Sequence, residues 1–210
     1  MNRATLITEG KIWALRGGGA LLLLILINEL SKRLKEQKAI RAAATTVDEP
    51  LDETQKNSII QIVRAFRKDG DKDIRKLAYI LATARHESRF KPIREYRAKA
   101  SQTTIYNLQN RYWYTGYYGR GFVQLTWESN YQEMGELLKI DLVNKPDLAL
   151  DPYFGARILV SGMINGNFGH RLDRYINDTQ KDYWNARRSV NGTDKADLIA
   201  DYAKQIENNL

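Results

Sequence analysis

Cysteine is absent from this sequence of 210 residues, and proline and histidine are scarce. Without cysteine there can be no disulfide framework, thiol nucleophile or thiolate metal site. A chain without cysteine works equally well inside or outside the cell, so its compartment does not follow from this absence. Four prolines and a hydrophobic content of 43% exclude collagen-like and disordered chains. The two histidines are His86 and His170, and the zinc motif HExxH fails because Phe90 stands where its second histidine would be. We therefore expect no metal and no cofactor.

A large excess of one charge is also missing from most of the chain. The formal net charge is +8, but residues 1–46 hold eight Lys/Arg against three Glu, and residues 47–210 hold 25 Lys/Arg against 22 Asp/Glu. The basicity therefore lies mainly beside the N-terminal apolar run, where an anionic membrane surface is a better partner than DNA. We expect no nucleic-acid partner, and a mildly cationic domain suits a polyanionic bacterial wall.

The longest uncharged run, Gly17 to Ile27, is short for a membrane span. Its eleven residues reach about 16 Å as a helix, whereas a bilayer core is roughly 30 Å thick. Extending the segment to residues 12–30 gives the length but includes Arg16, Asn28 and Glu29, which could snorkel. We expect a membrane anchor or interfacial helix here; a cleaved signal peptide and a packing helix are the alternatives.

The remaining pattern indicates a mainly helical domain. Residues 28–44 read as a charged helical stalk that breaks at Thr45 to Pro50, so the domains are expected at 1–46 and 47–210. Apolar spacing predicts one helix ending near Asp69-Gly70 and a second ending between Glu87 and Phe90. Residues 91–118 read as a Tyr/Trp-rich loop. Further helices are predicted at 128–139, 152–165, 179–189 and 194–208.

Glu87 and Glu95 form a pair of carboxylates in different settings. Glu87 ends its predicted helix, where the partial negative charge of the helix favours the protonated carboxyl that a general acid needs. Glu95 follows Pro92 in a loop, where solvation favours the ionised form. Glycosidic hydrolysis uses one carboxyl to protonate the leaving oxygen and another to activate water. Alone the pair is weak support, because the chain has 25 Asp/Glu.

A stronger pattern is YYGRGFVQLTWESNY, from Tyr117 to Tyr131. Two glycines bracket Arg120, and the following residues alternate with a period of two, which predicts a strand with Val123, Leu125 and Trp127 facing inward. Its amide, hydroxyl and aromatic groups suit a polysaccharide site, but an ordinary buried strand fits the pattern equally well.

Four motifs together resemble glycoside hydrolase family 19, the chitinase and phage endolysin group. The segment above resembles the family's YYGRGPIQLSWNYNY, and His86-Glu87-Ser88 resembles its HET/HES motif. Residues 144–152 (NKPDLALDP) resemble its NPDL…DP element, and residues 188–192 (RSVNG) resemble its RRINGG element. The resemblance covers about residues 77–192. The sequence departs from the family pattern at Arg89-Phe90, which replace the usual Gly-Gly, so we expect a different local turn there. It also departs from the pattern at Phe122 and Glu128.

The resemblance implies a mainly α, lysozyme-like, two-lobed domain with a small β/loop element lining the cleft. The N-terminal hydrophobic helix expected from the apolar run precedes this domain and lies outside the resemblance. The resemblance implies that Glu87 is the general acid, Glu95 the second carboxylate and Thr126 a holder of the attacking water. The substrate contacts that it implies are His86, Tyr118, Arg120, Gln124, Asn130 and Asn191. Among them, His86 is expected mainly as a structural neighbour of the acid. Arg120 is expected to shape the cleft by pairing with a catalytic carboxylate. The resemblance also implies that the reaction inverts the anomeric configuration, with the two catalytic carboxyl groups roughly 6.5–9.5 Å apart.

The leading hypothesis is a peptidoglycan hydrolase of the endolysin type that cleaves the β-1,4 bond between N-acetylmuramic acid and N-acetylglucosamine. We expect a membrane-associated viral protein, in the virion or the host envelope, whose catalytic domain acts on the wall. A chitinase, a lytic transglycosylase and an inactive wall-binding virion protein remain alternatives. Arg187-Arg188 could also bind phosphate, although a structural or sugar-binding role fits them better.

Overall fold

The computed structural model describes the backbone of residues 3–210 and the side chains from Ala20 onward. It divides into two compact units, Met1–Gln37 and Lys38–Leu210, which are considered separately. The α-helices are α1 (Arg3–Ala44), α2 (Glu53–Asp69), α3 (Ile74–Ser88), α4 (Thr103–Asn110), α5 (Glu128–Leu138), α6 (Pro152–Asn165) and α7 (Ala196–Asn209). The short 3-10 helices are η1 (Trp113–Thr115), η2 (Pro146–Leu150), η3 (Leu172–Arg174) and η4 (Asn185–Ser189).

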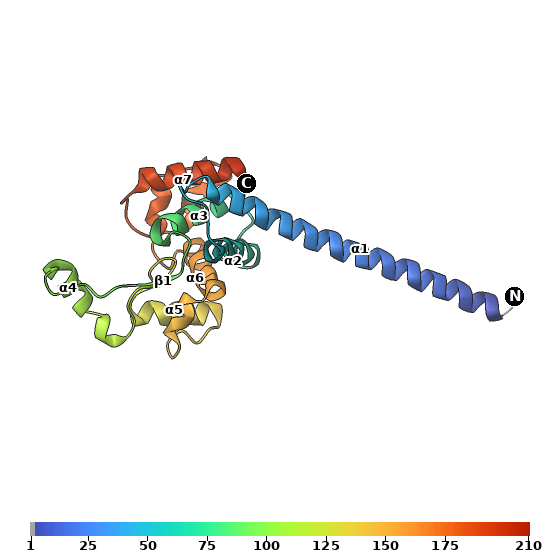
Figure 1. The fold of residues 1–210 in the computed structure, drawn as a ribbon, viewed down its shortest axis with the longest axis horizontal. Coiled ribbons are helices and arrows are strands. Elements are labelled where there is room, and N and C mark those ends of the chain that lie inside the picture. Colours follow the sequence, from blue (N-terminus) through green and yellow to red (C-terminus); the bar gives the residue numbers. More distant parts are fainter. Residues whose placement is uncertain (1–2) are drawn as a thin grey trace. The chain divides into compact units, whose positions relative to one another are not determined.

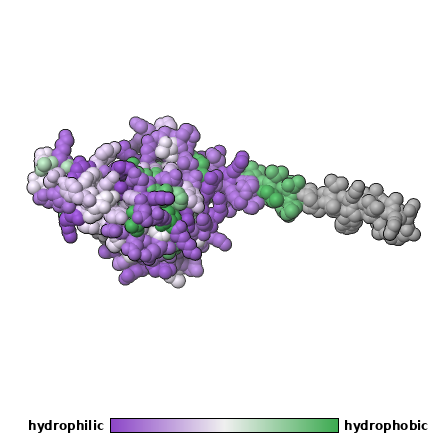
Figure 2. Space-filling model, turned by 90° about the horizontal axis from the view of Figure 1, so that it is seen from below, coloured by the Kyte–Doolittle hydropathy of each residue, from purple (hydrophilic) through white to green (hydrophobic). Residues whose placement is uncertain are grey.

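The first unit carries a run of exposed apolar side chains on α1. Residues 21–27, with Leu30 and Leu34, are each exposed by 50% or more, and Figure 2 shows this stretch in green. Among the residues that could be searched, no helix has both the length and the apolarity to cross a bilayer. Residues 12–19 of the expected membrane segment lie outside the described side chains, so that segment stays a prediction.

The second unit begins within the last turns of α1. Ala39, Ala42 and Ala43 are fully buried in its core, which is why the compact unit starts at Lys38, before the expected boundary at 46/47. The hydroxyls of Thr45 and Thr46 donate to the carbonyls of Ala42 and Ala43, at 2.7 Å each. The amides of the same two threonines donate to the same carbonyls, and α1 stops at Ala44, as the break at 45–50 predicted.

The helices that frame the site follow their apolar spacing. Asp52 and Gln55 form a reciprocal capping box at the start of α2, which ends at Asp69 as predicted. The next helix, α3, ends at Ser88, within the predicted range. The predicted helices at 128–139, 152–165 and 194–208 match α5, α6 and α7 to within two residues.

Two hydrophobic clusters give the domain its two lobes. The larger one gathers side chains of α2, α3, α6 and α7, which Figure 1 shows packed together. The smaller one lies around α5 and the loops on either side of it. The helix α6 serves both, because Leu159 and Met163 enter the larger cluster and Ile158 enters the smaller one. The mainly α, two-lobed expectation is confirmed.

The strand predicted at 123–128 is wrong. The strand β2 contains only Arg120–Gly121 and pairs antiparallel with β1 (Ile93–Arg94). Arg120 and Leu125 exchange both backbone hydrogen bonds, so the intervening residues form a tight loop. Leu125 is buried, but Trp127 is 40% exposed and does not face inward. The period of two therefore did not reflect an extended backbone.

Two further predictions on secondary structure fail. The helix predicted at 179–189 is replaced by the hairpin β3 (Ile176–Asn177) and β4 (Gln180–Lys181), followed by η4. In the hairpin turn, Asn177 Oδ1 accepts from the amide and hydroxyl of Thr179, a local bond that competes with helix formation. The loop predicted at 91–118 contains α4 and η1.

Candidate active site

Glu87 lies in the last turn of α3 and lines a cavity of about 750 Å³. Its Oε1 lies 2.6 Å from Nη1 of Arg187, whose side chain is 2% exposed, while that of Glu87 is 20% exposed. The contact is a charge contact, since its angles fall outside hydrogen-bond geometry. Glu87 therefore meets a buried cation on one side and an open cavity on the other. The cavity is lined by Val47, Asp48, Glu49, Pro50, Asp52, Gln55, Arg85, His86, Glu87, Ser88, Arg89, Lys91 and Ile93.

Arg187 comes from η4, a hundred residues after Glu87. Its Nε donates to the carbonyl of Asp194 at 2.9 Å, which fixes the guanidinium. Its burial rules out a phosphate-binding surface role for this arginine. The Arg187 guanidinium is therefore a fixed, buried charge beside the Glu87 carboxyl. Nothing in the spacing of the sequence indicated this pair.

His86 lines the same cavity. Burial lowers the pKa of His86; Glu87 acts in the opposite direction, and Arg187 reinforces the effect of burial. The imidazole is therefore neutral near pH 7. In the described part of the chain it makes no side-chain hydrogen bond, so its expected hydrogen-bonding role beside the acid is not seen.

The turn after Glu87 places two consecutive residues in the left-handed region. Arg89 has φ 51° and Phe90 has φ 60°, a conformation that favours glycine. The amides of Arg89 and Phe90 close the helix by bonding the carbonyls of Arg85 and Ala84, and Phe90 is fully buried. The expectation that Arg89-Phe90 force a different turn fails, because they adopt the backbone that Gly-Gly would favour.

Glu95 follows β1 and accepts three hydrogen bonds. Gln109 Nε2 and the Tyr112 hydroxyl donate to Oε1 at 2.8 and 2.7 Å, and the Gly119 amide donates to Oε2 at 2.9 Å. Burial, together with the adjacent carboxylate, raises the pKa of Tyr112 to about 12, so its hydroxyl stays a donor at neutral pH. These three donors hold the Glu95 carboxyl in place. Gln109 and Tyr112 were not singled out from the sequence.

Arg120 pairs with Asp147 rather than with Glu87 or Glu95. Its Nε lies 2.7 Å from Asp147 Oδ1, and Nη1 donates to the carbonyls of Gly116 and Tyr118 and to the Tyr131 hydroxyl. The expected pairing with a catalytic carboxylate is therefore wrong. Arg120 instead holds the backbone before Gly119, whose amide contacts Glu95, so its effect on that carboxylate is indirect.

The polar residues of the YYGRG segment bond mainly to nearby backbone. Gln124, with φ 54°, donates to the carbonyls of Ile93 and Gly121 at 3.0 and 3.1 Å. The Thr126 hydroxyl donates to the carbonyl of Gln124 at 2.8 Å, and Asn130 donates to the carbonyl of Thr126 at 2.8 Å. These bonds fix the loop that closes against β1.

The structure brings the predicted residues Glu95 and Gln124 together and leaves Asn191 apart from them. A Cβ built on Gly119 would lie 2.8 Å from Gln124 Oε1 and 3.2 Å from Glu95 Oε2, so both side chains converge on this glycine. Ile93, which bonds Gln124, also lines the cavity of Glu87. Asn191 is joined to the Glu87 side only through its amide, which donates to the carbonyl of Arg187, and its side chain is exposed.

Aromatic side chains, half-buried except for Trp127, surround the Glu95 side. Tyr118 stacks on Trp113, with centroids 4.5 Å apart, and Tyr112 meets Trp127 edge to face at 5.0 Å. Trp127 has φ 75°, a strained value for a tryptophan. The sequence analysis placed Trp127 in a core; its exposure makes it a candidate for contact with a sugar face.

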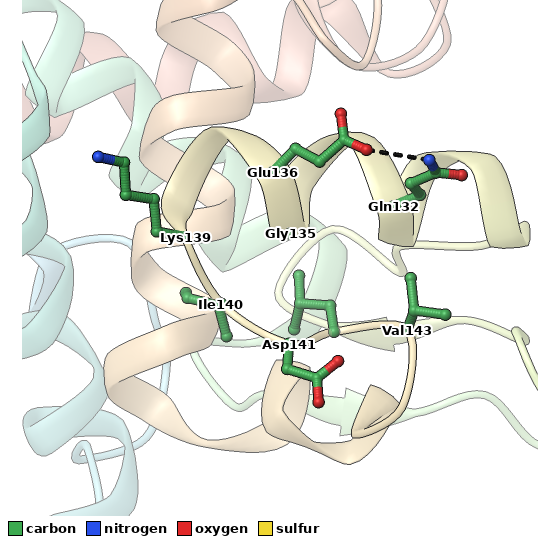
Figure 3. Close-up of a pocket in the computed structure, with 8 residues that line it drawn as sticks. Gln132, Gly135, Glu136, Lys139, Ile140, Asp141 and Val143 are labelled. Atoms are coloured by element: carbon green, nitrogen blue, oxygen red, sulfur yellow. Dashed lines mark hydrogen bonds between the residues drawn. The ribbon is translucent and has the colours of Figure 1, made fainter.

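A second cavity, of about 580 Å³, lies between α5 and the chain that follows it. Figure 3 shows its lining residues, with Gln132 Nε2 donating to Glu136 Oε1 at 2.9 Å. None of the predicted site residues lines this cavity. The part of the chain searched for metal ligands holds no cluster of three or more His, Asp or Glu able to bind an ion.

Comparisons with known proteins agree with the motifs. Residues 63–157 match the family model of glycoside hydrolase family 19, described as chitinase class I. This range contains three of the four motifs and ends before residues 188–192.

Shorter segments of the chain are similar to individual proteins that are named as chitinases or chitinase-like. An acidic endochitinase of Petunia hybrida is 61% identical over 33 residues, which are 16% of this chain and 13% of that protein. Chitinase 11 of Oryza sativa subsp. japonica is 51% identical over 45 residues, 21% and 18% of the two chains. An inactive chitinase-like protein 1 of Hevea brasiliensis is 56% identical over 32 residues, 15% and 10%. The matched segments thus span less than a fifth of these relatives.

Two solved structures are similar at low identity. A crystal structure of a chitinase C mutant has a TM-score of 0.49 and 19% identity, and covers 83% of this chain and 90% of its own. A bacterial family 19 chitinase has a TM-score of 0.40 and 17% identity, with 81% and 84% covered.

Proposed function

We propose, from the family 19 membership of residues 63–157, that this chain hydrolyses β-1,4 bonds in a glycan of N-acetylated hexosamines. The observation that carries the proposal is a pair of carboxylates held in two different ways. Glu87 faces an open cavity with a single buried cation behind it, whereas Glu95 is held by three hydrogen-bond donors. Activity needs its own test, since one of the relatives is named inactive.

The chemistry follows from these settings. Glu87 gives its proton to the glycosidic oxygen, and Arg187 then stabilises the carboxylate that remains. Glu95, already ionised, takes a proton from a water whose oxygen attacks the anomeric carbon, so the leaving sugar departs as an alcohol. Thr126 orients that water, and Gln124, Asn130 and Asn191 contact the sugars. The product carries the inverted anomeric configuration.

Two glycans fit this reaction. The names of the relatives favour chitin, a neutral polymer. The backbone of peptidoglycan, cleaved between N-acetylmuramic acid and N-acetylglucosamine, has the same linkage and adds carboxylates. It is favoured by the excess of Lys/Arg in residues 89–120, where seven stand against a single acidic residue, Glu95.

The test uses purified peptidoglycan and chitin oligosaccharides, with products identified by mass spectrometry. A hydrolase adds one water per cleaved bond, and a lytic transglycosylase gives an anhydro-sugar. Glu87→Gln should abolish cleavage and leave glycan binding. Glu128→Gln, an exposed carboxylate on α5, is the matched control and should keep full activity. If Glu87→Gln still cleaves either glycan, Glu87 is not the general acid.

We further propose that the chain attaches to a membrane surface through residues 12–30, in a virion or host envelope, with its catalytic unit acting on the wall. The exposed leucines of α1 and the cations that follow them, Lys32, Arg33 and Lys35, support an interfacial helix. Sedimentation with anionic lipid vesicles should capture the full chain but not residues 38–210. Equal capture of both would exclude attachment through α1.

A further inference from the structure

The charge of the second unit is concentrated in one segment. Residues 89–120 hold seven Lys/Arg and one acidic residue, whereas the rest of residues 47–210 holds eighteen Lys/Arg and twenty-one Asp/Glu. The same segment contains α4 and η1, which lie at one end of the domain in Figure 1. The positive charge is therefore local to this end rather than a property of the whole unit.

Several cations of this segment lack an acidic partner. Within the described part of the chain, Arg97, Lys99 and Arg111 form no ion pair, and Arg97 bonds only the neutral amides of Gln109 and Asn110. Arginines elsewhere are neutralised, as in the pairs of Arg157 with Asp69, Arg75 with Asp73, and Arg171 with Asp173. An anionic ligand would therefore stabilise these three unpaired cations.

Aromatic rings surround these cations. Arg97 lies over the rings of Tyr106, Trp113 and Tyr114, at 4.4, 5.2 and 5.4 Å from their centroids. Arg111 lies 5.6 Å from the centroid of Trp127. Tyr114 is 78% exposed and Trp127 is 40% exposed. In Figure 2 the α4 end shows pale and purple spheres side by side, which are residues of intermediate and of hydrophilic character.

This surface is continuous with Glu95. Gln109 and Tyr112, which bond the carboxylate, belong to α4 and to the turn after it. The Gln109 side chain also bonds the carbonyl of Tyr96 and the amide of Ala98, and so ties the chain after Glu95 to α4. A glycan bound here would therefore run past the base of the proposed reaction.

We propose that Arg97, Lys99, Arg111, Trp113, Tyr114 and Trp127 form a binding surface, the basic–aromatic platform, for a glycan strand that bears carboxylates. Sugar faces stack on the exposed rings, and carboxylates of lactyl groups or attached peptides pair with the three free cations. A neutral glycan uses only the rings. The platform rests on the proposed function and deepens it, because it selects peptidoglycan over chitin.

The test measures binding without cleavage, in the full chain with Glu87→Gln. Sedimentation is measured with insoluble chitin and with peptidoglycan freed of phosphate polymers, so that carboxylate is its anionic group. Arg97→Gln, Lys99→Gln and Arg111→Gln together should weaken peptidoglycan binding roughly tenfold or more, as expected for three surface charge pairs, and leave chitin binding unchanged. The matched control combines Lys139→Gln, Lys145→Gln and Lys204→Gln, three exposed lysines elsewhere, and should bind both glycans normally.

Two further arms sharpen the result. Methyl esterification of the peptidoglycan carboxylates should reduce binding of the parent protein and abolish the difference between it and the platform variant. Tyr114→Ala should weaken binding to both glycans, because the ring contact does not depend on charge. Equal losses on both glycans for the platform variant, or equal losses for the control variant, would overturn the proposal.

The two proposals can fail separately. If the unsubstituted chain cleaves neither glycan while the charge-dependent preference persists, the platform stands and the proposed reaction falls. If cleavage occurs with no preference for the carboxylated glycan, the reaction stands and the platform falls.

Discussion

The two carboxylates differ in what holds them. Glu87 belongs to the larger lobe, where one buried arginine from a distant segment faces it and the core helices α3 and α7 fix the frame. Glu95 belongs to an extension, where an amide, a phenol and a backbone amide share the contact and the surrounding rings are partly half-buried and partly exposed. The comparison suggests that the acid depends on packing and the base depends on a hydrogen-bond network. Substitutions on each side should therefore affect different properties.

The largest effect is expected for Arg187→Met. It removes a buried cation and its bond to the Asp194 carbonyl, and should cost about 2–4 kcal/mol of unfolding free energy. Denaturant unfolding measures it. Arg188→Met, next in sequence but exposed, should change stability by less than about 0.5 kcal/mol. Adding Glu87→Gln to Arg187→Met should recover part of the loss, and a purely additive result would mean that the two charges do not interact.

Tyr112→Phe should sharpen the comparison from the other side. Losing one charge-assisted hydrogen bond to Glu95 should reduce kcat about 10- to 100-fold, with little change in melting temperature. Tyr106→Phe, whose hydroxyl makes no hydrogen bond within the described residues, is the control. An unchanged kcat for Tyr112→Phe would exclude a positioning role for this hydroxyl.

A smaller effect is expected in the turn between the two carboxylates. Arg89→Gly should relieve the left-handed backbone and stabilise the protein by up to about 1 kcal/mol, after allowing for the greater freedom of glycine in the unfolded chain. Phe90→Gly relieves the left-handed backbone at its own position but removes a buried side chain and leaves a cavity, so it should destabilise the protein strongly. Thermal unfolding distinguishes the two, and a loss of stability in Arg89→Gly would show that the arginine side chain matters more than its backbone.

The smallest effect concerns acid stability. The pKa of His86 is lowered in the folded state, so below its ordinary value near 6.5 the unfolded chain binds more protons than the folded one. His86 therefore reduces stability as the pH falls below that value, and has no such effect above it. His86→Gln should therefore lose less stability between pH 7 and pH 5 than the parent protein. Identical pH dependence in both would contradict the burial of this imidazole.

Much of the helical frame could be predicted because its apolar residues recur with the helical period. The exceptions share a physical reason. The helix α4 was missed because its buried residue is the polar Gln109, while Ile105 and Leu108 are exposed. The loop at 121–124 was read as a strand because the positive φ of Gln124 is imposed by tertiary contacts that no local pattern records.

The candidate site divided in the same way. The local settings indicated Glu87 and Glu95, and the roles of Gln124 and Thr126 followed from the resemblance. Arg187 and Asp147 act through contacts between segments far apart in the chain, with Arg187 a hundred residues after Glu87. Pairing of this kind depends on how the segments pack, which residue spacing does not encode.

The stretch from Glu87 to Glu95 is anchored at two points, by the burial of Phe90 and by the pairing of Ile93 with Gly121. Few of its residues are free to adjust, so its length sets the gap between the two carboxyl groups. The stereochemical outcome of a glycosidase depends on that gap, since a narrow one leaves no room for water and favours a covalent sugar intermediate. Deleting a single residue between these anchors would thus test whether loop length, rather than residue identity, selects the anomer released.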